Sequence, residues 1–375
     1  MHSEPPADDR AIALLTDLVS TPSPSGQERA ASERLVGWMA DHGFDAYVDP
    51  VGNAVGARGR GPREVLLLGH IDTFPGEVPV RREGDLLYGR GSVDAKGPLC
   101  AFAAAAALDP VPAGWRVTVV GAVEEEAATS RGARHVLEAR TPGERPGPPA
   151  YCVIGEPSRW DRVTLGYRGR LVLDLTLRAP FAHSAGAERL PAERGIALWA
   201  VVQRYCEAWN AARGVGDSVF DALSPSLRTF VTSDEGAFGL ARLGVGIRVP
   251  LAADPDMVQR ELTQRLREAA APDEHVVLDI GVLGGEPAYR GGKSNDLVRA
   301  FLAEIRAGGG TPRFVVKTGT SDMNVVGPLW PTTPIVAYGP GNSALDHTPW
   351  EHVELPEFLA TIGVLRGVLR RLVTG

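Results

Sequence analysis

The sequence predicts an α/β protein built on a mostly parallel sheet, with a smaller α+β domain inserted into it. Short β-branched segments alternate with helical segments over roughly the first 160 residues, which is typical of parallel sheets whose faces are covered by helices. The pattern changes near Leu165 and resumes near residue 284. We therefore predict a main domain in two parts, residues 1–164 and 284–375, interrupted by an insert at 165–283.

The first part of the main domain opens with two helical patterns. Residues 8–19 and 27–42 each carry apolar side chains at helical spacing, and a Pro/Ser/Gly-rich break at 21–26 separates them. The alanine-rich stretch 98–108 is apolar at nearly every position, which predicts a buried helix. Predicted strands around these helices are 46–48, 54–57, 65–68, 117–122 and 151–154.

The insert contains longer elements in the order β-α-β-α-β. This order resembles a ferredoxin-like domain, in which the helices cover one face of the sheet. The α/β pattern of the main domain then returns and closes on a helix that starts at Pro356. The predicted elements are strands 171–177, 244–249 and 275–282 and helices 190–212 and 256–270 in the insert, followed by helix 295–307 and strands 313–316 and 334–338.

Composition and charge exclude several classes of protein. A net charge of -7 without a local basic stripe argues against nucleic-acid binding. Three widely separated cysteines do not make a disulfide framework, and a reducing compartment fits them. The acidic, polar start and the lack of a long apolar run predict neither export nor membrane insertion, so we expect a cytoplasmic protein.

Candidate chemistry begins where the buried strand VLLLG ends in His70 and Asp72. Side chains at i and i+2 of a strand leave the same face, so Asp72 can hydrogen-bond the imidazole of His70. That is how the outer partner of a histidine metal ligand usually acts. Taken alone, a histidine at a strand end is more often structural.

Further acids and a second histidine follow other predicted strands or lie in Gly-rich loops. Each has an ordinary explanation by itself, such as a helix cap for an Asp or a solvated loop for adjacent glutamates. Because the carboxyl ends of parallel strands share one edge of a sheet, these side chains are expected to meet. Nitrogen and oxygen donors together suit a hydrolytic pair of metal ions. The residues are Asp94, Glu124, Glu125, Glu126, Glu156 and His347.

Taken together, the motifs resemble the acetylornithine deacetylase and succinyl-diaminopimelate desuccinylase type of metallopeptidase. The matching motifs cover essentially the whole chain and are GHIDTFPG, GRGSVDAKG, a Glu pair after a strand, GEPS and HTPWEH. The resemblance implies a di-metal peptidase domain with the insert as a lid and dimerisation domain. It also implies two divalent ions, Zn2+ or Co2+, one on His70 and Glu156, another on Glu126 and His347, with Asp94 bridging both and Asp72 orienting His70.

The glutamate triplet departs from the family pattern, which usually has Asp-Glu-Glu. Counting from the start of the strand at Val117 makes Glu125 the general base and Glu126 the ligand. Shifting the frame by one residue makes Glu124 the base and Glu125 the ligand instead. We prefer the first frame, since the strand fixes the geometry and the following loop can absorb an extra residue.

The resemblance also implies residues that contact the substrate. His183 in FAHSAG matches a lid histidine that stabilises the oxyanion, often from the partner subunit, which would require a homodimer. Arg248 in GIRVP matches a position that holds a substrate carboxylate. Two Gly-rich loops hold further candidates, whose ordinary explanation is turn and cap formation: Lys293, Lys317, Thr320, Ser321 and Asp322.

Within this family, the chain resembles the hydrolases that release lysine, and in some relatives ornithine, from the C-terminal glutamate γ-carboxyl of LysW, an acidic amino-group carrier protein of lysine biosynthesis. Asn342 and Trp350 stand where acids are expected, which affects substrate preference rather than the metal site. A small-molecule N-acyl-amino-acid deacylase would share every metal residue. A peptide-cleaving aminopeptidase and a non-catalytic metal-binding homologue are further alternatives.

Overall fold

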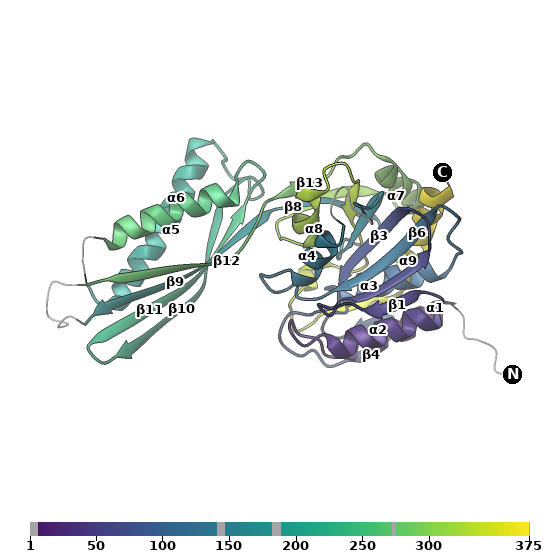
Figure 1. The fold of residues 1–375 in the computed structure, drawn as a ribbon, viewed down its shortest axis with the longest axis horizontal. Coiled ribbons are helices and arrows are strands. Elements are labelled where there is room, and N and C mark those ends of the chain that lie inside the picture. The colour runs from purple at the N-terminus through teal and green to yellow at the C-terminus, as the bar shows by residue number, and fades with distance from the viewer. Residues whose placement is uncertain (1–6, 141–146, 182–188, 272–274, 375) are drawn as a thin grey trace. The chain divides into compact units, whose positions relative to one another are not determined.

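A computed structural model describes residues 7–140, 147–181, 189–271 and 275–374 of the chain. The chain divides into two compact units (Figure 1). The large unit comprises Met1–Gly166, Arg290–Val316 and Ser321–Gly375, and the small unit comprises Tyr167–Tyr289 and Lys317–Thr320. In the described part of the chain, no helix combines the length and the apolar character that a membrane span requires.

Among its described residues, the large unit is built on a mixed sheet of nine strands. Along the sheet the order is β1-β2-β6-β3-β7-β15-β8-β13, and β14 pairs with β8. A second, three-stranded sheet has the order β16-β5-β4. The strands are β1 (Asp45–Val48), β2 (Ala54–Gly59), β3 (Arg63–His70), β4 (Arg81–Glu83), β5 (Leu86–Tyr88), β6 (Trp115–Ala122), β7 (Tyr151–Gly155), β8 (Arg162–Tyr167), β13 (Tyr289–Arg290), β14 (Arg313–Lys317), β15 (Ile335–Ala337) and β16 (His352–Glu354).

The centre of the nine-stranded sheet is parallel, as predicted. Strands β6, β3, β7 and β15 run in the same direction, whereas β1, β2 and β8 pair antiparallel. Every residue of β3 after Arg63 is buried, because this strand has neighbours on both sides and layers on both faces. Its run of valine and leucine therefore ends inside the protein, at His70.

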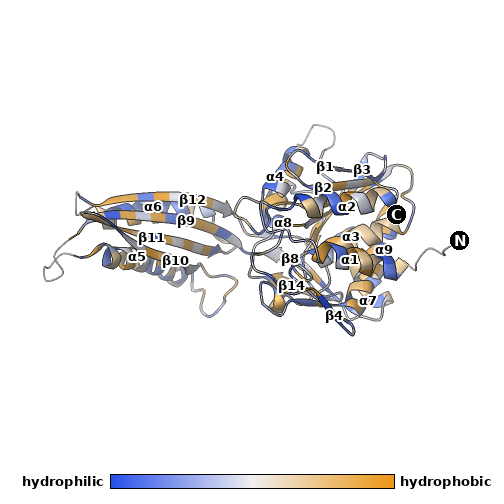
Figure 2. Ribbon diagram, turned by 90° about the horizontal axis from the view of Figure 1, so that it is seen from below, coloured by the Kyte–Doolittle hydropathy of each residue, from blue (hydrophilic) through white to orange (hydrophobic). Residues whose placement is uncertain are grey.

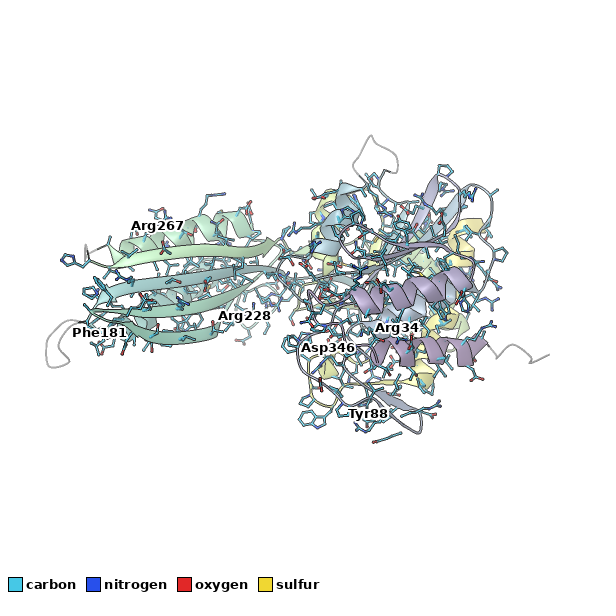
Figure 3. All side chains as sticks on the ribbon, turned by 60° about the horizontal axis from the view of Figure 1, so that its bottom comes forward. Arg34, Tyr88, Phe181, Arg228, Arg267 and Asp346 are labelled. Atoms are coloured by element: carbon cyan, nitrogen blue, oxygen red, sulfur yellow. The ribbon has the colours of Figure 1, made fainter. Side chains whose placement is uncertain are left out.

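Helices enclose this sheet. The core joins buried side chains of α1, α2, α3, α7 and α9 to those of the strands, and α4 and α8 contact each other beside the sheet. The alanine-rich α3 is buried from Lys96 to Ala106, as its composition predicts. Arg34 lies on the surface of the large unit, on α2 (Figure 3). Its Nη1 is 2.6 Å from Oδ1 of Asp17 on α1. The helices are α1 (Ala7–Val19), α2 (Arg29–Asp41), α3 (Lys96–Ala107), α4 (Arg131–Glu138), α7 (Asp296–Ala307), α8 (Asp322–Val326) and α9 (Leu355–Thr374).

As far as the structure describes it, the small unit is an antiparallel sheet with two helices on one face. The strand order is β10-β11-β9-β12, and α5 and α6 pack together against it (Figure 1). Buried and partly exposed residues alternate along the second half of β9, so that its apolar side chains meet the helices, and the strands show this alternation in hydropathy (Figure 2). The elements are β9 (Gly169–Pro180), α5 (Pro191–Ala212), β10 (Ser224–Glu235), β11 (Phe238–Val249), α6 (Pro255–Ala270) and β12 (Val277–Glu286).

The predicted order β-α-β-α-β of the insert was wrong by one strand. The structure has β-α-β-β-α-β, because β10 precedes β11 and forms one edge of the sheet. Ten of the twelve residues of β10 are exposed, so its sequence lacks the alternation that reveals a half-buried strand. The ferredoxin-like topology itself is confirmed by the complete strand order.

Candidate metal centre

Strand register places His70 and Glu156 side by side. In the parallel pairing of β3 with β6, His70 stands opposite Ala122, and in the pairing of β3 with β7, Gly69 stands opposite Gly155. Glu156 follows Gly155 directly, so it emerges at the same sheet edge. A Cβ atom on Gly155 would lie 2.9 Å from Cα of Gly69. Glycine therefore permits the close approach of the two strand ends.

Asp94 joins two clusters of potential ligand atoms. It lies just before α3, and its Oδ1 is 3.3 Å from Nε2 of His70. Its Oδ2 is 3.0 Å from Nε2 of His347, which also lies 3.0 Å from Oε1 of Glu126. Within each cluster, the donor atoms lie within 4.8 Å of one another. The first cluster is His70, Asp94 and Glu156, and the second is Asp94, Glu126 and His347.

The electrostatics of these clusters favour a cation. Hydrogen bonds to Asp94 and Glu126 raise the pKa of His347 to about 10, although burial opposes the rise. Burial raises the pKa of Glu125 well above its usual value, and the negative charges of Glu156 and Asp322 act in the same direction. Carboxylates that are buried close together repel one another unless positive charge neutralises them. The donor set, two imidazoles and three carboxylates, suits divalent ions that accept both nitrogen and oxygen.

Asp72 occupies the predicted place beside His70 and has further contacts. Nδ1 of His70 lies 3.0 Å from the Asp72 carbonyl oxygen and 3.3 Å from Oδ1 of Asp72. Both residues are buried, and Ser25 donates to the carboxylate at 2.7 Å. Because Nδ1 is held on this side, Nε2 points to Asp94. Outer contacts of this kind fix the orientation of an imidazole ligand.

The three glutamates after β6 point in different directions. Glu124 accepts hydrogen bonds from Thr129 and Arg131, and it belongs to neither cluster. Oε2 of Glu125 lies 4.0 Å from Nε2 of His70, and only 11% of the Glu125 side chain is exposed. Glu126 contacts His347, as described above. The structure thus places Glu125 and Glu126, and not Glu124, at the centre.

Two neighbours of the clusters were not among the predicted site residues. Phe74 stacks on the imidazole of His347, with ring centroids 4.2 Å apart and planes inclined by 11°. Glu351 is fully buried, and its Oε1 accepts hydrogen bonds from the amides of Val93 and Asp94 at 3.0 and 3.1 Å. Phe74 lies in the motif GHIDTFPG and Glu351 in the motif HTPWEH, so their position within these motifs is the sequence signal that could have predicted them.

The predicted substrate residues are distributed over both units. Asp322 is buried and close enough to Glu125 to influence its pKa, while Ser321 is the N-cap of α8 and accepts from the amide of Met323. In the large unit Lys293 lies over the ring of Phe314. In the small unit Arg248 donates to Thr320 at 2.7 Å, and Lys317 lies over the ring of Tyr167. His183 lies outside the described residues.

Comparison with known proteins identifies the family. The model of peptidase family M20/M25/M40 matches residues 66–371. The chain is 44% identical to the LysW-lysine hydrolase of Deinococcus radiodurans over 97% of this chain and 98% of that protein. It is 28% identical to the LysW-lysine/LysW-ornithine hydrolase of Saccharolobus solfataricus over 93% of this chain and 92% of that protein.

The fold agrees with this family. The M20 family metallo-carboxypeptidase Sso-CP2 from Sulfolobus solfataricus superposes with a TM-score of 0.77 at 18% sequence identity, covering 97% of this chain and 99% of that one. The fold class and the family resemblance inferred from the motifs are therefore both confirmed. The chain is a hydrolase that belongs to peptidase family M20/M25/M40.

Proposed function

We propose that this chain is a two-metal amide hydrolase that releases lysine from the C-terminal glutamate γ-carboxyl of the acidic carrier protein LysW, in lysine biosynthesis. The observation that carries the hydrolytic part is the pair of donor clusters that share Asp94. The full-length similarity to a LysW-lysine hydrolase supports the substrate. Ornithine on the same carrier is a second substrate to test, because a relative is named for both.

Five residues would hold the metal ions. His70 and Glu156 would hold one ion, Glu126 and His347 would hold the other, and Asp94 would contribute to both. Zn2+ and Co2+ both suit this mixture of imidazole and carboxylate donors. When bound, the two ions lower the pKa of water and polarise the scissile carbonyl.

The protein's own groups would move the protons. Glu125 takes a proton from the attacking water and transfers it to the departing amine, so the products are the carrier's free γ-carboxylate and lysine. Asp72 orients His70 throughout. His183 stabilises the oxyanion, and we propose a cytoplasmic homodimer in which it acts across subunits.

The remaining residues would bind the substrate. Arg248 holds a carboxylate of the substrate, and Thr320, its hydrogen-bond partner, fixes the direction of the guanidinium. Lys293 and Lys317 supply further positive charge for carboxylates. Asp322, with Ser321 beside it, meets the ammonium group of the amino acid that is released.

The test compares substrates on enzyme reconstituted with Zn2+ or Co2+. We expect turnover of LysW-lysine to exceed that of acetylornithine and succinyl-diaminopimelate. Preferential turnover of either small substrate would contradict the carrier and leave the metal chemistry intact. LysW-ornithine and a dipeptide amide complete the set of substrates. Turnover of LysW-ornithine would show that the enzyme accepts the second carrier substrate, and turnover of the dipeptide amide would show an aminopeptidase activity.

Two alanine variants test the role of the glutamates. Glu125→Ala should lower kcat by roughly 10²- to 10⁴-fold, the usual contribution of a general base. Glu124→Ala is the matched control, since Glu124 contacts Thr129 and Arg131 instead, and its kcat should stay within about threefold of wild type. A loss of kcat in Glu124→Ala as large as that expected of Glu125→Ala would show that the other frame, with Glu124 as the base and Glu125 as the ligand, is correct.

A further inference from the structure

The chain segment after β6 is held by buried side chains of three distant segments. Four successive amides, from Val123 to Glu126, each donate to a side-chain oxygen. The amide of Val123 donates to Oδ1 of Asn53 at 3.0 Å, and that of Glu124 to Oε1 of Glu28 at 3.2 Å. The amides of Glu125 and Glu126 donate to Oδ1 and Oδ2 of Asp72 at 3.1 and 3.0 Å. We call Glu28, Asn53 and Asp72 the amide cradle.

The side chains of the amide cradle are also held by hydrogen bonds other than those to these amides. Asn53 is fully buried, and its Nδ2 donates to Asp49 at 2.8 Å and to the carbonyl of Gly132 at 3.2 Å. Glu28 is 6% exposed and also accepts from the amide of Gly26 at 2.8 Å. Each acceptor therefore has a second anchor in its own surroundings, which makes it a rigid point of attachment.

This arrangement bears on the register of the glutamates. β6 ends at Ala122, so the following amides leave the sheet and need other acceptors. Glu124 has a positive φ of 59°, an uncommon conformation for a residue other than glycine. A slip of one residue would leave a buried acceptor of the cradle without its donor, at a cost of about 1–3 kcal/mol for each lost contact.

We propose that Glu28 and Asn53 are positioning residues for the metal centre, acting with Asp72. By holding the amides from Val123 to Glu126, they turn Glu126 toward His347 and Glu125 toward His70, and they turn Glu124 away. Glu28 is not simply a helix-terminal residue, since one oxygen joins the start of α2 to the triplet. The inference rests on the proposed function for the ligand role of Glu126.

Glu28 allows a sharp test, because glutamine keeps the oxygen that accepts both amides and methionine keeps only the shape. Glu33→Met is the matched control, since Glu33 is exposed on the same helix and pairs with Arg29. Hydrogen–deuterium exchange of the metal-free protein reports the amides of 123–126 directly. Competition titration with Zn2+ or Co2+ then reports the affinity of each of the two sites.

We expect Glu28→Met to increase hydrogen–deuterium exchange in the peptide that contains 123–126 and to weaken metal binding at the site of Glu126 and His347. The affinity of that site should fall by about 10- to 100-fold, as is usual when an outer partner of a ligand is removed. The affinity of the His70 and Glu156 site should stay within about threefold of wild type, and Glu28→Gln should restore both the exchange and the affinity. Where Glu28→Met does not fold, Glu28→Asp withdraws the same oxygen by one methylene and carries the same expectations.

Three results would overturn the inference: unchanged amide exchange in Glu28→Met, an equal loss of metal affinity at both sites, or no recovery of exchange and affinity in Glu28→Gln. The first means that the amides are held in another way, and the other two mean that Glu28 acts only on overall stability. Failure of the proposed function looks different. If the wild-type protein binds fewer than two ions, the metal assignment falls, while the exchange experiment still decides whether the cradle fixes the segment.

Discussion

The sharing of Asp94 predicts an unequal effect of ligand removal on stability. Its two oxygens face different histidines, at 3.3 Å from His70 and 3.0 Å from His347, so both donor clusters need it. Glu156, by contrast, belongs to one cluster. Asp94→Ala should therefore abolish the stabilisation that both ions provide, whereas Glu156→Ala should abolish that of one ion.

The magnitude follows from the linkage of binding to folding. At a free metal concentration of 100 times the dissociation constant, each ion stabilises the folded state by about 2.7 kcal/mol, and two independent ions by about 5.4 kcal/mol. Wild-type protein should show about 5.4 kcal/mol between metal-loaded and chelator-treated samples. The difference should be about 2.7 kcal/mol in Glu156→Ala and close to zero in Asp94→Ala.

Urea unfolding with excess metal and with chelator measures these differences. Each variant is compared with itself in the two conditions, so any effect of the substitution on the metal-free fold cancels. A metal-dependent difference near 2.7 kcal/mol in Asp94→Ala would refute the reasoning, because one ion would then bind without the shared carboxylate.

Three further predictions concern contacts around the centre and in the sheet. Phe74→Ala should weaken the His347 site by about 2- to 12-fold, since a stacked ring pair contributes about 0.5–1.5 kcal/mol, and metal titration against Phe74→Tyr checks it. Glu64→Leu should lower the free energy of unfolding by about 3–5 kcal/mol, because it leaves the buried Arg140 guanidinium without its carboxylate partner. The double variant with Arg140→Leu should recover much of this loss in urea unfolding, and a double variant no more stable than the single one would contradict the pairing. Burial raises the pKa of Glu64, but the hydrogen bonds from Arg140 and Thr118 outweigh burial, so that the pKa is lowered. The stability that Glu64 provides should therefore be present above about pH 4.3 and be lost as the pH falls below this value. If the free energies of unfolding of wild type and Glu64→Gln stay parallel from pH 6 to pH 3, this prediction is excluded.

The sequence by itself determined the fold class and the set of residues at the centre. Buried strands that end abruptly in acids or histidine are visible as local patterns, as in VLLLGH and YCVIGE. The ends of parallel strands converge, so the pattern predicts that His70, Glu156 and the acids after β6 meet, and the structure brings them together. The sequence could not predict β10, because an edge strand that is exposed over nearly all of its length has no alternation of apolar and polar side chains.

Only the tertiary structure decided how these side chains are oriented. Three adjacent glutamates look alike in sequence, and nothing within the motif tells which one points away. Their directions depend on Glu28, Asn53 and Asp72, which lie from about fifty to nearly a hundred residues earlier in the chain. Hydrogen bonds between segments so far apart leave no periodic signal, and a cost of about 1–3 kcal/mol for each unpaired buried oxygen is enough to select one register.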